Sequence, residues 1–258
     1  MFLGLSCIAP EFAARLKRRI LRKFFKKEIV RLDEWDKWNV RAGFTTRHFP
    51  VVLHKTDDLL NEDTQQRFRH TISAGAGFSA PTRYVFLNQV HGDNVQVLEG
   101  GQGNSAPGEF FHLMNTDGVI TNIKGLTLLV FTADCLPIFL CAPPWIGLAH
   151  AGRRGTEKEI ARRAFEAIRE KSGCPASGIR VIFGPRISKN CYEVGEESGK
   201  KIYFDLAGEN KKQLLAAGAS AGRITDLDIC TVLENGDFYS FRKEKEAAGR
   251  MISFISKF

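Results

Sequence analysis

One stretch of the chain constrains the fold more than any other. Residues 126–132 read Leu-Thr-Leu-Leu-Val-Phe-Thr, an apolar run that follows Gly125, and such a run is typical of a strand buried on both faces. Residues 137–141 and 146–150 repeat the pattern, with a Pro-Pro turn between them. Parallel crossovers need a dozen residues or more, so we expect three buried strands that run antiparallel to one another.

Weaker patterns complete the outline. A helix is expected to end near Ile72, before the glycines at 75 and 77, and a capping box from Thr156 to Glu159 predicts the start of another helix that ends before Gly173. Further helices are expected at 191–204 and 211–217. Alternating or apolar residues predict strands at 38–47, 84–87, 94–98, 117–121, 179–183 and 238–242.

The positive charge of the chain is unevenly distributed. Residues 1–28 contain eight Lys and Arg and two acidic residues, so they carry +6 of the net +8. Apolar residues recur at helical spacing from Phe12 to Phe25, which predicts a basic amphipathic helix. This helix could dock on an anionic membrane surface or on RNA, or pack on the body of the protein. The nearly neutral remainder gives no reason to expect a nucleic-acid partner.

No apolar window is long enough to span a membrane, and the order of apolar and basic residues at the N-terminus does not match a secretory signal. We therefore expect a cytoplasmic protein. A chain of 258 residues with 43% hydrophobic residues can form one large domain or two small ones. Its six cysteines are spread singly, without a CxxC pair, and are expected to be free thiols.

Three side chains at strand ends could form a metal site. His91 and His150 lie beside small residues, and Cys135 follows the buried run 126–132. Two imidazoles and one thiolate are a sufficient donor set for catalytic zinc, which commonly takes three protein ligands. The same residues allow a second interpretation, in which Cys135 is a nucleophile activated by either histidine. Spacing along the chain does not decide between the two.

A series of short motifs surrounds these residues. In order along the chain, they are Asn88-Gln89-Val90-His91-Gly92, Asp117-Gly118-Val119-Ile120-Thr121, Thr132-Ala133-Asp134-Cys135-Leu136-Pro137, His150-Ala151-Gly152-Arg153-Arg154-Gly155, Gly184-Pro185, Cys191-Tyr192-Glu193-Val194-Gly195, Phe238-Tyr239-Ser240-Phe241-Arg242 and Gly249-Arg250. The series resembles the YfiH family, whose members are called laccase-domain proteins, polyphenol oxidases or purine nucleoside phosphorylases. The resemblance runs from about Val40 to the C-terminus.

The resemblance implies a single α/β (α+β) domain of mixed β-sheets with flanking helices, here residues 38–258, preceded by a basic extension at 1–37. It also implies a metal site at His91, Cys135 and His150, with zinc as the expected ion and copper as another. The implied activity is phosphorolysis of adenosine, inosine and methylthioadenosine, with adenosine deamination as a second reaction. An open metal site is compatible with both reactions.

Other site residues follow from the matched motifs. Asp134 could transfer protons or orient the neighbouring thiolate, or it could cap backbone amides. Phosphate needs cationic donors, and the candidates are Arg47, Arg154 and Arg242; Gln89 is a further substrate-binding candidate. Two features depart from the family pattern: Arg153 replaces its usual Trp, and the usual Gly-Gly-Val-Ser run after Arg47 is missing.

Two other enzyme classes remain open. The chain could be a cysteine-dependent hydrolase that acts on amide bonds of peptidoglycan precursors. A copper-dependent polyphenol oxidase is the weaker alternative, because six histidines are too few for the mononuclear and trinuclear copper centres of a laccase. Copper in a single His2Cys site remains compatible with the donor set.

Overall fold

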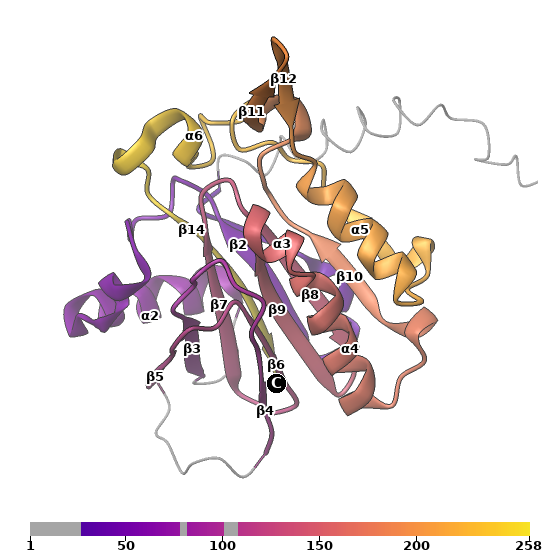
Figure 1. Ribbon diagram of the computed structural model, residues 1–258. Helices are drawn as coiled ribbons and strands as arrows, with labels where there is room; N and C mark the ends of the chain where they lie inside the picture. The colour runs from indigo at the N-terminus through magenta and orange to yellow at the C-terminus, as the bar shows by residue number, and fades with distance from the viewer. Residues whose placement is uncertain (1–26, 78–81, 101–107) are drawn as a thin grey trace, which may run out of the picture.

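The computed structural model describes residues 27–77, 82–100 and 108–258. They form two six-stranded mixed sheets, a small hairpin and flanking helices (Figure 1). The helix expected at 12–25 lies outside the described residues. In order across the first sheet, the strands are β1 (Ile29–Arg31), β2 (Val40–Thr45), β14 (Met251–Lys257), β7 (Leu126–Thr132), β3 (Arg83–Leu87) and β5 (Phe110–Leu113).

The second sheet and the hairpin contain the remaining strands. In order across the second sheet, these are β13 (Ile224–Asp226), β10 (Arg180–Phe183), β8 (Leu136–Ala142), β9 (Trp145–Ala151), β6 (Gly118–Thr121) and β4 (Val95–Leu98); the hairpin pairs β11 (Glu193–Glu197) with β12 (Lys200–Tyr203). The α-helices are α2 (Glu62–Ala76), α3 (Arg153–Glu157), α4 (Ile160–Ser172), α5 (Leu206–Ala216) and α6 (Phe241–Glu244). The 3-10 turns are η1 (Asp33–Trp38), η2 (Thr56–Leu60), η3 (Ala176–Gly178), η4 (Lys189–Cys191), η5 (Ala221–Arg223) and η6 (Lys245–Ala247).

The two sheets pack face to face, and helices cover their outer faces. Leu128 and Val130 of β7 enter the core between the sheets, whereas Leu129 and Phe131 pack outward in the cluster formed by α2. The outer face of the second sheet packs against α4 and α5 (Figure 1). The apolar run 126–132 is therefore buried on both faces, as the sequence predicts, and the expected fold class is confirmed.

Of the three strands that were expected to run antiparallel to one another, the first does not pair with the other two. β8 and β9 pair antiparallel, but β7 belongs to the other sheet, where it lies between β14 and β3. The connection at residues 133–135 thus crosses from one sheet to the other. The partners of β7 are distant in sequence, and turn length carries no information about them. β14, a central strand, was not predicted.

Three local expectations are also wrong. Residues 193–203 form the β11–β12 hairpin and not the expected helix. Ser198 and Gly199 at its turn have positive φ angles of 50° and 75°, which a type I′ hairpin turn requires and a helix does not allow. Residues 238–242 lead into α6 and form no strand. Thr156 caps no helix: it lies inside α3, and its hydroxyl accepts a hydrogen bond from the Asn210 side chain at 2.8 Å.

The expected apolar face of the helix after His150 is correct. Ile160, Ala164, Phe165 and Ile168 of α4 are buried, and Gly173 caps the helix in the left-handed conformation. Residues 29–37, which the sequence analysis grouped with the N-terminal extension, pack into the folded domain. β1 pairs with β2, and Trp35 of η1 is fully buried in the core between the sheets. None of the described helices is long and apolar enough to cross a membrane.

Candidate functional site

The crossing between the two sheets forms the floor of a cavity of about 800 Å³. Asp134 adopts a positive φ of 91° at the crossing. Its carboxylate accepts hydrogen bonds from the Thr231 hydroxyl and the Arg242 backbone N–H, both at 2.6 Å, and its carbonyl accepts one from Ile187 at 2.8 Å. These three contacts hold the crossing in a conformation that a non-glycine residue seldom adopts.

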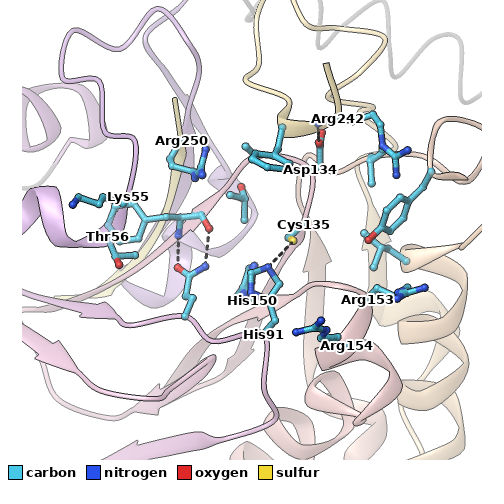
Figure 2. Close-up of a pocket in the computed structure, with 18 of the residues that line it drawn as sticks. Lys55, Thr56, His91, Asp134, Cys135, His150, Arg153, Arg154, Arg242 and Arg250 are labelled. Atoms are coloured by element: carbon cyan, nitrogen blue, oxygen red, sulfur yellow. Dashed lines mark hydrogen bonds between the residues drawn. The ribbon is translucent and has the colours of Figure 1, made fainter. Parts of the chain in front are cut away.

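His91, Cys135 and His150, hereafter the triad, meet in this cavity (Figure 2). His91 follows β3, Cys135 directly precedes β8, and His150 is in β9. The His91 Nε2 and Cys135 Sγ atoms are 3.8 Å apart, and the two imidazole centroids are 4.8 Å apart with nearly perpendicular rings. One donor atom from each residue lies within 4.8 Å of the others. The fold thus gathers three residues that are far apart in sequence.

Asp117 holds both histidines of the triad, a role that the sequence analysis missed. Its fully buried carboxylate accepts hydrogen bonds from His150 Nδ1 at 2.8 Å and from the His91 backbone N–H at 3.0 Å. The other oxygen accepts from the N–H groups of Gly92 at 2.8 Å and Val90 at 3.2 Å. With Nδ1–H donating to Asp117, His150 presents Nε2 to the cavity. An acidic residue directly before a buried strand was the available signal.

The triad is electrostatically coupled. Burial raises the pKa of the Cys135 thiol, but the neighbouring His150 and His91 outweigh this effect and lower the pKa to about 6. Burial lowers the pKa of His150, whereas Cys135 and Asp117 raise it to about 9. The thiolate is therefore the favoured form at neutral pH, and the thiolate is the form in which cysteine binds a metal or attacks an electrophile.

The donor set fits a divalent ion such as zinc. Bond lengths of about 2.3 Å to sulfur and about 2.0–2.1 Å to nitrogen place tetrahedral donors about 3.3–3.6 Å apart, and the 3.8 Å between His91 and Cys135 is close to this range. The backbone also fits tightly around the triad: a Cβ on Gly152 would lie 2.7 Å from His91 Cδ2 and 3.1 Å from Cys135 Sγ. Three protein donors leave a coordination position for a substrate or water.

Residues 41–257 match the family model described as multi-copper polyphenol oxidoreductase laccase. The chain belongs to this family. A relative in Bacillus subtilis, named purine nucleoside phosphorylase YlmD, is 34% identical over 194 residues, which cover 67% of this chain and 70% of the relative. Adenosine deaminase RL5, from an unknown prokaryotic organism, is 31% identical over 165 residues, 55% of this chain and 63% of the relative.

Solved structures of the laccase-domain family share the fold. The crystal structure of the Bacillus licheniformis hypothetical protein YfiH has a TM-score of 0.78 and 25% identity, over 90% of this chain and 97% of that protein. YlmD from Geobacillus stearothermophilus has a TM-score of 0.75 and 29% identity, over 90% and 97% of the two chains. The resemblance to the YfiH family is confirmed.

The expected substrate-binding residues of this laccase-domain protein fall into two groups. Gln89, Arg154 and Arg242 line the cavity, but Arg47 does not. The Arg47 guanidinium donates to the Asn235 carbonyl and, at 2.7 Å, to the Glu244 carboxylate, and it lies 4.9 Å from the Tyr239 ring centroid. Because its guanidinium is bonded to other parts of the protein outside the cavity, Arg47 is not a candidate phosphate ligand.

Two of the residues that line the cavity also form hydrogen bonds to the protein backbone. Both ends of the Gln89 side-chain amide bond to the Phe131 backbone at 2.8 Å, and this fixes the end of β3 against β7. Arg242 donates from Nη2 to the Glu193 carbonyl at 2.6 Å and lies over the Tyr192 ring. Arg154 differs, because its carbonyl accepts the Lys158 backbone N–H at 3.1 Å but its guanidinium has no hydrogen bond or ion pair among the described residues. Its guanidinium is available for a ligand.

Among the cavity residues that sequence reasoning did not single out, several offer charge or aromatic surface to a ligand. Lys55 and Arg250 add positive charge, whereas Tyr192 and Phe241 add aromatic surface. Phe241 is 41% exposed although it is a large apolar side chain. Tyr192, Phe241 and Arg250 lie inside motifs that match the family, so those motifs could have identified them as site residues. Lys55 lies in a segment without any motif and could be found only from the structure.

Proposed function

We propose that this chain is a metal-dependent purine nucleoside phosphorylase that also deaminates adenosine, with zinc held by His91, Cys135 and His150. The observation that carries the proposal is the convergence of these three donors in a cavity that Arg154 also lines. The names of the relatives, purine nucleoside phosphorylase YlmD and adenosine deaminase RL5, support the two reactions.

The cavity contains side chains that can bind the base and the phosphate of the proposed substrates. Tyr192 and Phe241 offer aromatic faces for a purine base. Arg154 and Arg153 would bind phosphate oxygens with charge-assisted hydrogen bonds and place the anion beside the triad. Phe131, Ile187 and Leu206 add apolar wall that displaces water when the nucleoside enters.

Phosphorolysis breaks the bond between C1′ of the sugar and N9 of the purine. A phosphate oxygen forms the new bond to C1′, and the base leaves with a proton, so the products are the free purine and ribose 1-phosphate. The arginines keep the phosphate in line with the bond that breaks and compensate its charge. A divalent ion in the triad would supply Lewis acidity beside the reacting groups. In deamination, water replaces the amino group at C6 of adenosine and ammonia leaves.

The cysteine hydrolase remains the second candidate because one observation favours it. The pKa of Cys135 is lowered to about 6 and His91 Nε2 lies 3.8 Å from its sulfur, an arrangement that also suits nucleophilic attack on an amide bond. Copper-dependent polyphenol oxidation has less support. Within the part of the chain that the structure describes, the triad is the one His, Cys, Asp and Glu cluster able to hold a metal, whereas a laccase needs several copper ions.

One experiment separates these candidates. Purified protein is incubated with adenosine, inosine or methylthioadenosine, with and without phosphate, while free base, sugar phosphate and ammonia are quantified and bound metal is measured. We expect phosphate-dependent release of base and about one zinc per chain, both lost in Cys135→Ser. Cys174→Ser, which changes a half-buried cysteine outside the cavity, should keep both. Rapid alkylation of Cys135 in active, metal-free protein would instead support the hydrolase, and absence of product from all three nucleosides would refute the phosphorylase.

A further inference from the structure

The cavity carries far more positive charge than one phosphate ion requires. Its lining contains one carboxylate, Asp134, and both oxygens of this group already accept hydrogen bonds from the protein. Among the described residues, Arg153 is the one basic residue of the lining that forms an ion pair, with Glu157 at 3.8 Å near the surface. The basic residues of the lining are Lys55, Arg153, Arg154, Arg242, Lys245 and Arg250.

These charges are spread across the triad. Figure 2 shows Arg153 and Arg154 on one side of Cys135 and His150, and Lys55 and Arg250 on the other. Arg153 and Arg154 belong to α3 on the second sheet, whereas Arg250 directly precedes β14 of the first sheet. Their positions on opposite sheets keep the two pairs apart. A single phosphate ion held by the α3 pair therefore leaves Lys55 and Arg250 without a phosphate partner.

The pair of Lys55 and Arg250 is built into the fold. The Arg250 backbone N–H donates to the Leu53 carbonyl at 2.7 Å, which fixes the segment before Lys55 against the start of β14. Arg250 Nη1 donates to the carbonyls of Ala248 at 2.8 Å and Gly249 at 3.2 Å. These neutral acceptors orient the half-buried guanidinium, and the acidic groups of Asp134, Glu246 and Asp58 act on its charge only at longer range than an ion pair. A site of this kind favours an anionic ligand.

We infer that the substrate of this cavity carries a phosphate ester of its own, held by Lys55 and Arg250, and is a nucleoside 5′-monophosphate. The inference rests on the proposed phosphorolysis. The 5′ carbon lies outside the sugar ring, so a phosphate on it reaches away from C1′ toward the far side of the triad. A volume of about 800 Å³ is within the range of cavities that enclose small ligands. Each phosphate ester brings about 1.5–2 negative charges at neutral pH.

The reaction is balanced without any further reactant. In adenosine 5′-monophosphate the C1′–N9 bond breaks and inorganic phosphate forms the bond to C1′. Adenine leaves with a proton that phosphate or solvent supplies. The second product is ribose 1,5-bisphosphate, because the 5′ ester does not take part. Arg153 and Arg154 hold the incoming phosphate, and Lys55 and Arg250 hold the ester.

The test compares adenosine 5′-monophosphate with adenosine, each with inorganic phosphate, using the full-length protein as purified. We expect kcat/KM to be at least about tenfold higher for the nucleotide, the factor that a charge-assisted hydrogen bond supplies. Lys55→Met should lower this ratio by about tenfold. Lys124→Met is the matched control, because Lys124 is an exposed lysine at the opposite end of β7, and it should leave the ratio unchanged.

Equal or better turnover of adenosine, or a ratio unaffected by Lys55→Met, would overturn the inference and leave the phosphorylase intact. Measuring the equilibrium affinity of the protein for each of the two compounds separates binding from turnover. If neither compound is cleaved, but the nucleotide binds more tightly than adenosine and loses this advantage in Lys55→Met, the anion site stands and the phosphorylase is refuted. Equal binding without turnover would refute both.

Discussion

Replacement of Asp117 by Asn tests whether one buried carboxylate organises the triad. The side chain is fully buried, and its two oxygens together accept hydrogen bonds from four donors: His150 Nδ1 and the backbone N–H groups of His91, Gly92 and Val90. Asparagine has nearly the same size, so Asp117→Asn creates no cavity. The variant changes charge and hydrogen bonding alone.

The expected cost follows from this geometry. One oxygen becomes an NH2 group, and in either orientation that group faces two donors that previously had an acceptor. A buried donor left without an acceptor costs about 1–3 kcal/mol, so two cost about 2–6 kcal/mol. For a chain of this length, about 2–4 °C of Tm correspond to each kcal/mol, and we expect Tm to fall by about 5–20 °C. Loss of the partner that orients a histidine ligand should also weaken metal binding by about 10–100-fold.

Thermal melts followed by circular dichroism, with a chelator present, measure stability without bound metal. Competition with a chromophoric chelator measures zinc affinity. Asp93→Asn is a suitable control because Asp93 is partly exposed and pairs with Arg163 at 3.0 Å on the surface. It should change stability by less than about 1 kcal/mol and leave zinc affinity unchanged.

Two results would refute this reasoning. If Asp117→Asn melts within about 2 °C of the wild type, the four hydrogen bonds do not carry the expected energy. If stability falls while zinc affinity stays the same, Asp117 supports the fold but does not orient a ligand.

Three further predictions concern the same region. Gly152→Ala should abolish metal binding while the protein stays folded, as measured by metal content and circular dichroism, because a Cβ there overlaps the triad and approaches Cys135 Sγ to 3.1 Å. Burial raises the pKa of the Glu244 carboxyl, but hydrogen-bond donors that include Arg47 outweigh burial and lower the pKa below its ordinary value of 4.5. The ionised carboxylate therefore stabilises the fold above pH 4.5, and this stabilisation is lost as the pH falls through the lowered pKa. Denaturant melts should therefore find Glu244→Gln less stable than the wild type by about 1–3 kcal/mol at pH 7, and this difference should shrink below pH 4.5. The control Glu197→Gln, at an exposed position, should leave stability unchanged. Chelation of metal-loaded protein should lower Tm, by about 5–10 °C if the metal is at about a hundred times its Kd, and an unchanged Tm would mean that no metal binds the native state.

Local patterns predicted those features of the fold that depend on neighbouring residues. The apolar run 126–132, the helix face from Ile160 to Ile168 and the glycine that ends this helix all reflect burial or backbone conformation, which short stretches encode directly. One pattern failed because remote contacts decide: β14 is recognisable only from its partners β2 and β7. The hairpin at 193–203 is a different failure, because its turn at Ser198 and Gly199 is local and the helical interpretation overlooked it.

The same division applies to the site. The three donor residues could be proposed from motif wording, because their types and positions at strand ends are local properties. Asp117 was overlooked and Lys55 could not be assigned, since their importance comes from groups that lie far away in the sequence. Arg47 was chosen for its charge, but its contacts with Asn235 and Glu244, about 190 residues away, take its guanidinium out of the cavity.

The sequence by itself determined the buried strands between residues 126 and 151, the family resemblance and the chemistry of the donors, because residue type and short-range periodicity carry that information. The tertiary structure alone decided that β7 and β8 lie in different sheets and that the turn between them forms the floor of the cavity. It also decided which arginines line the cavity and which bond elsewhere in the protein. Those outcomes depend on strand pairing between distant segments, where one sheet is brought against another by burial of apolar side chains and not by any local signal.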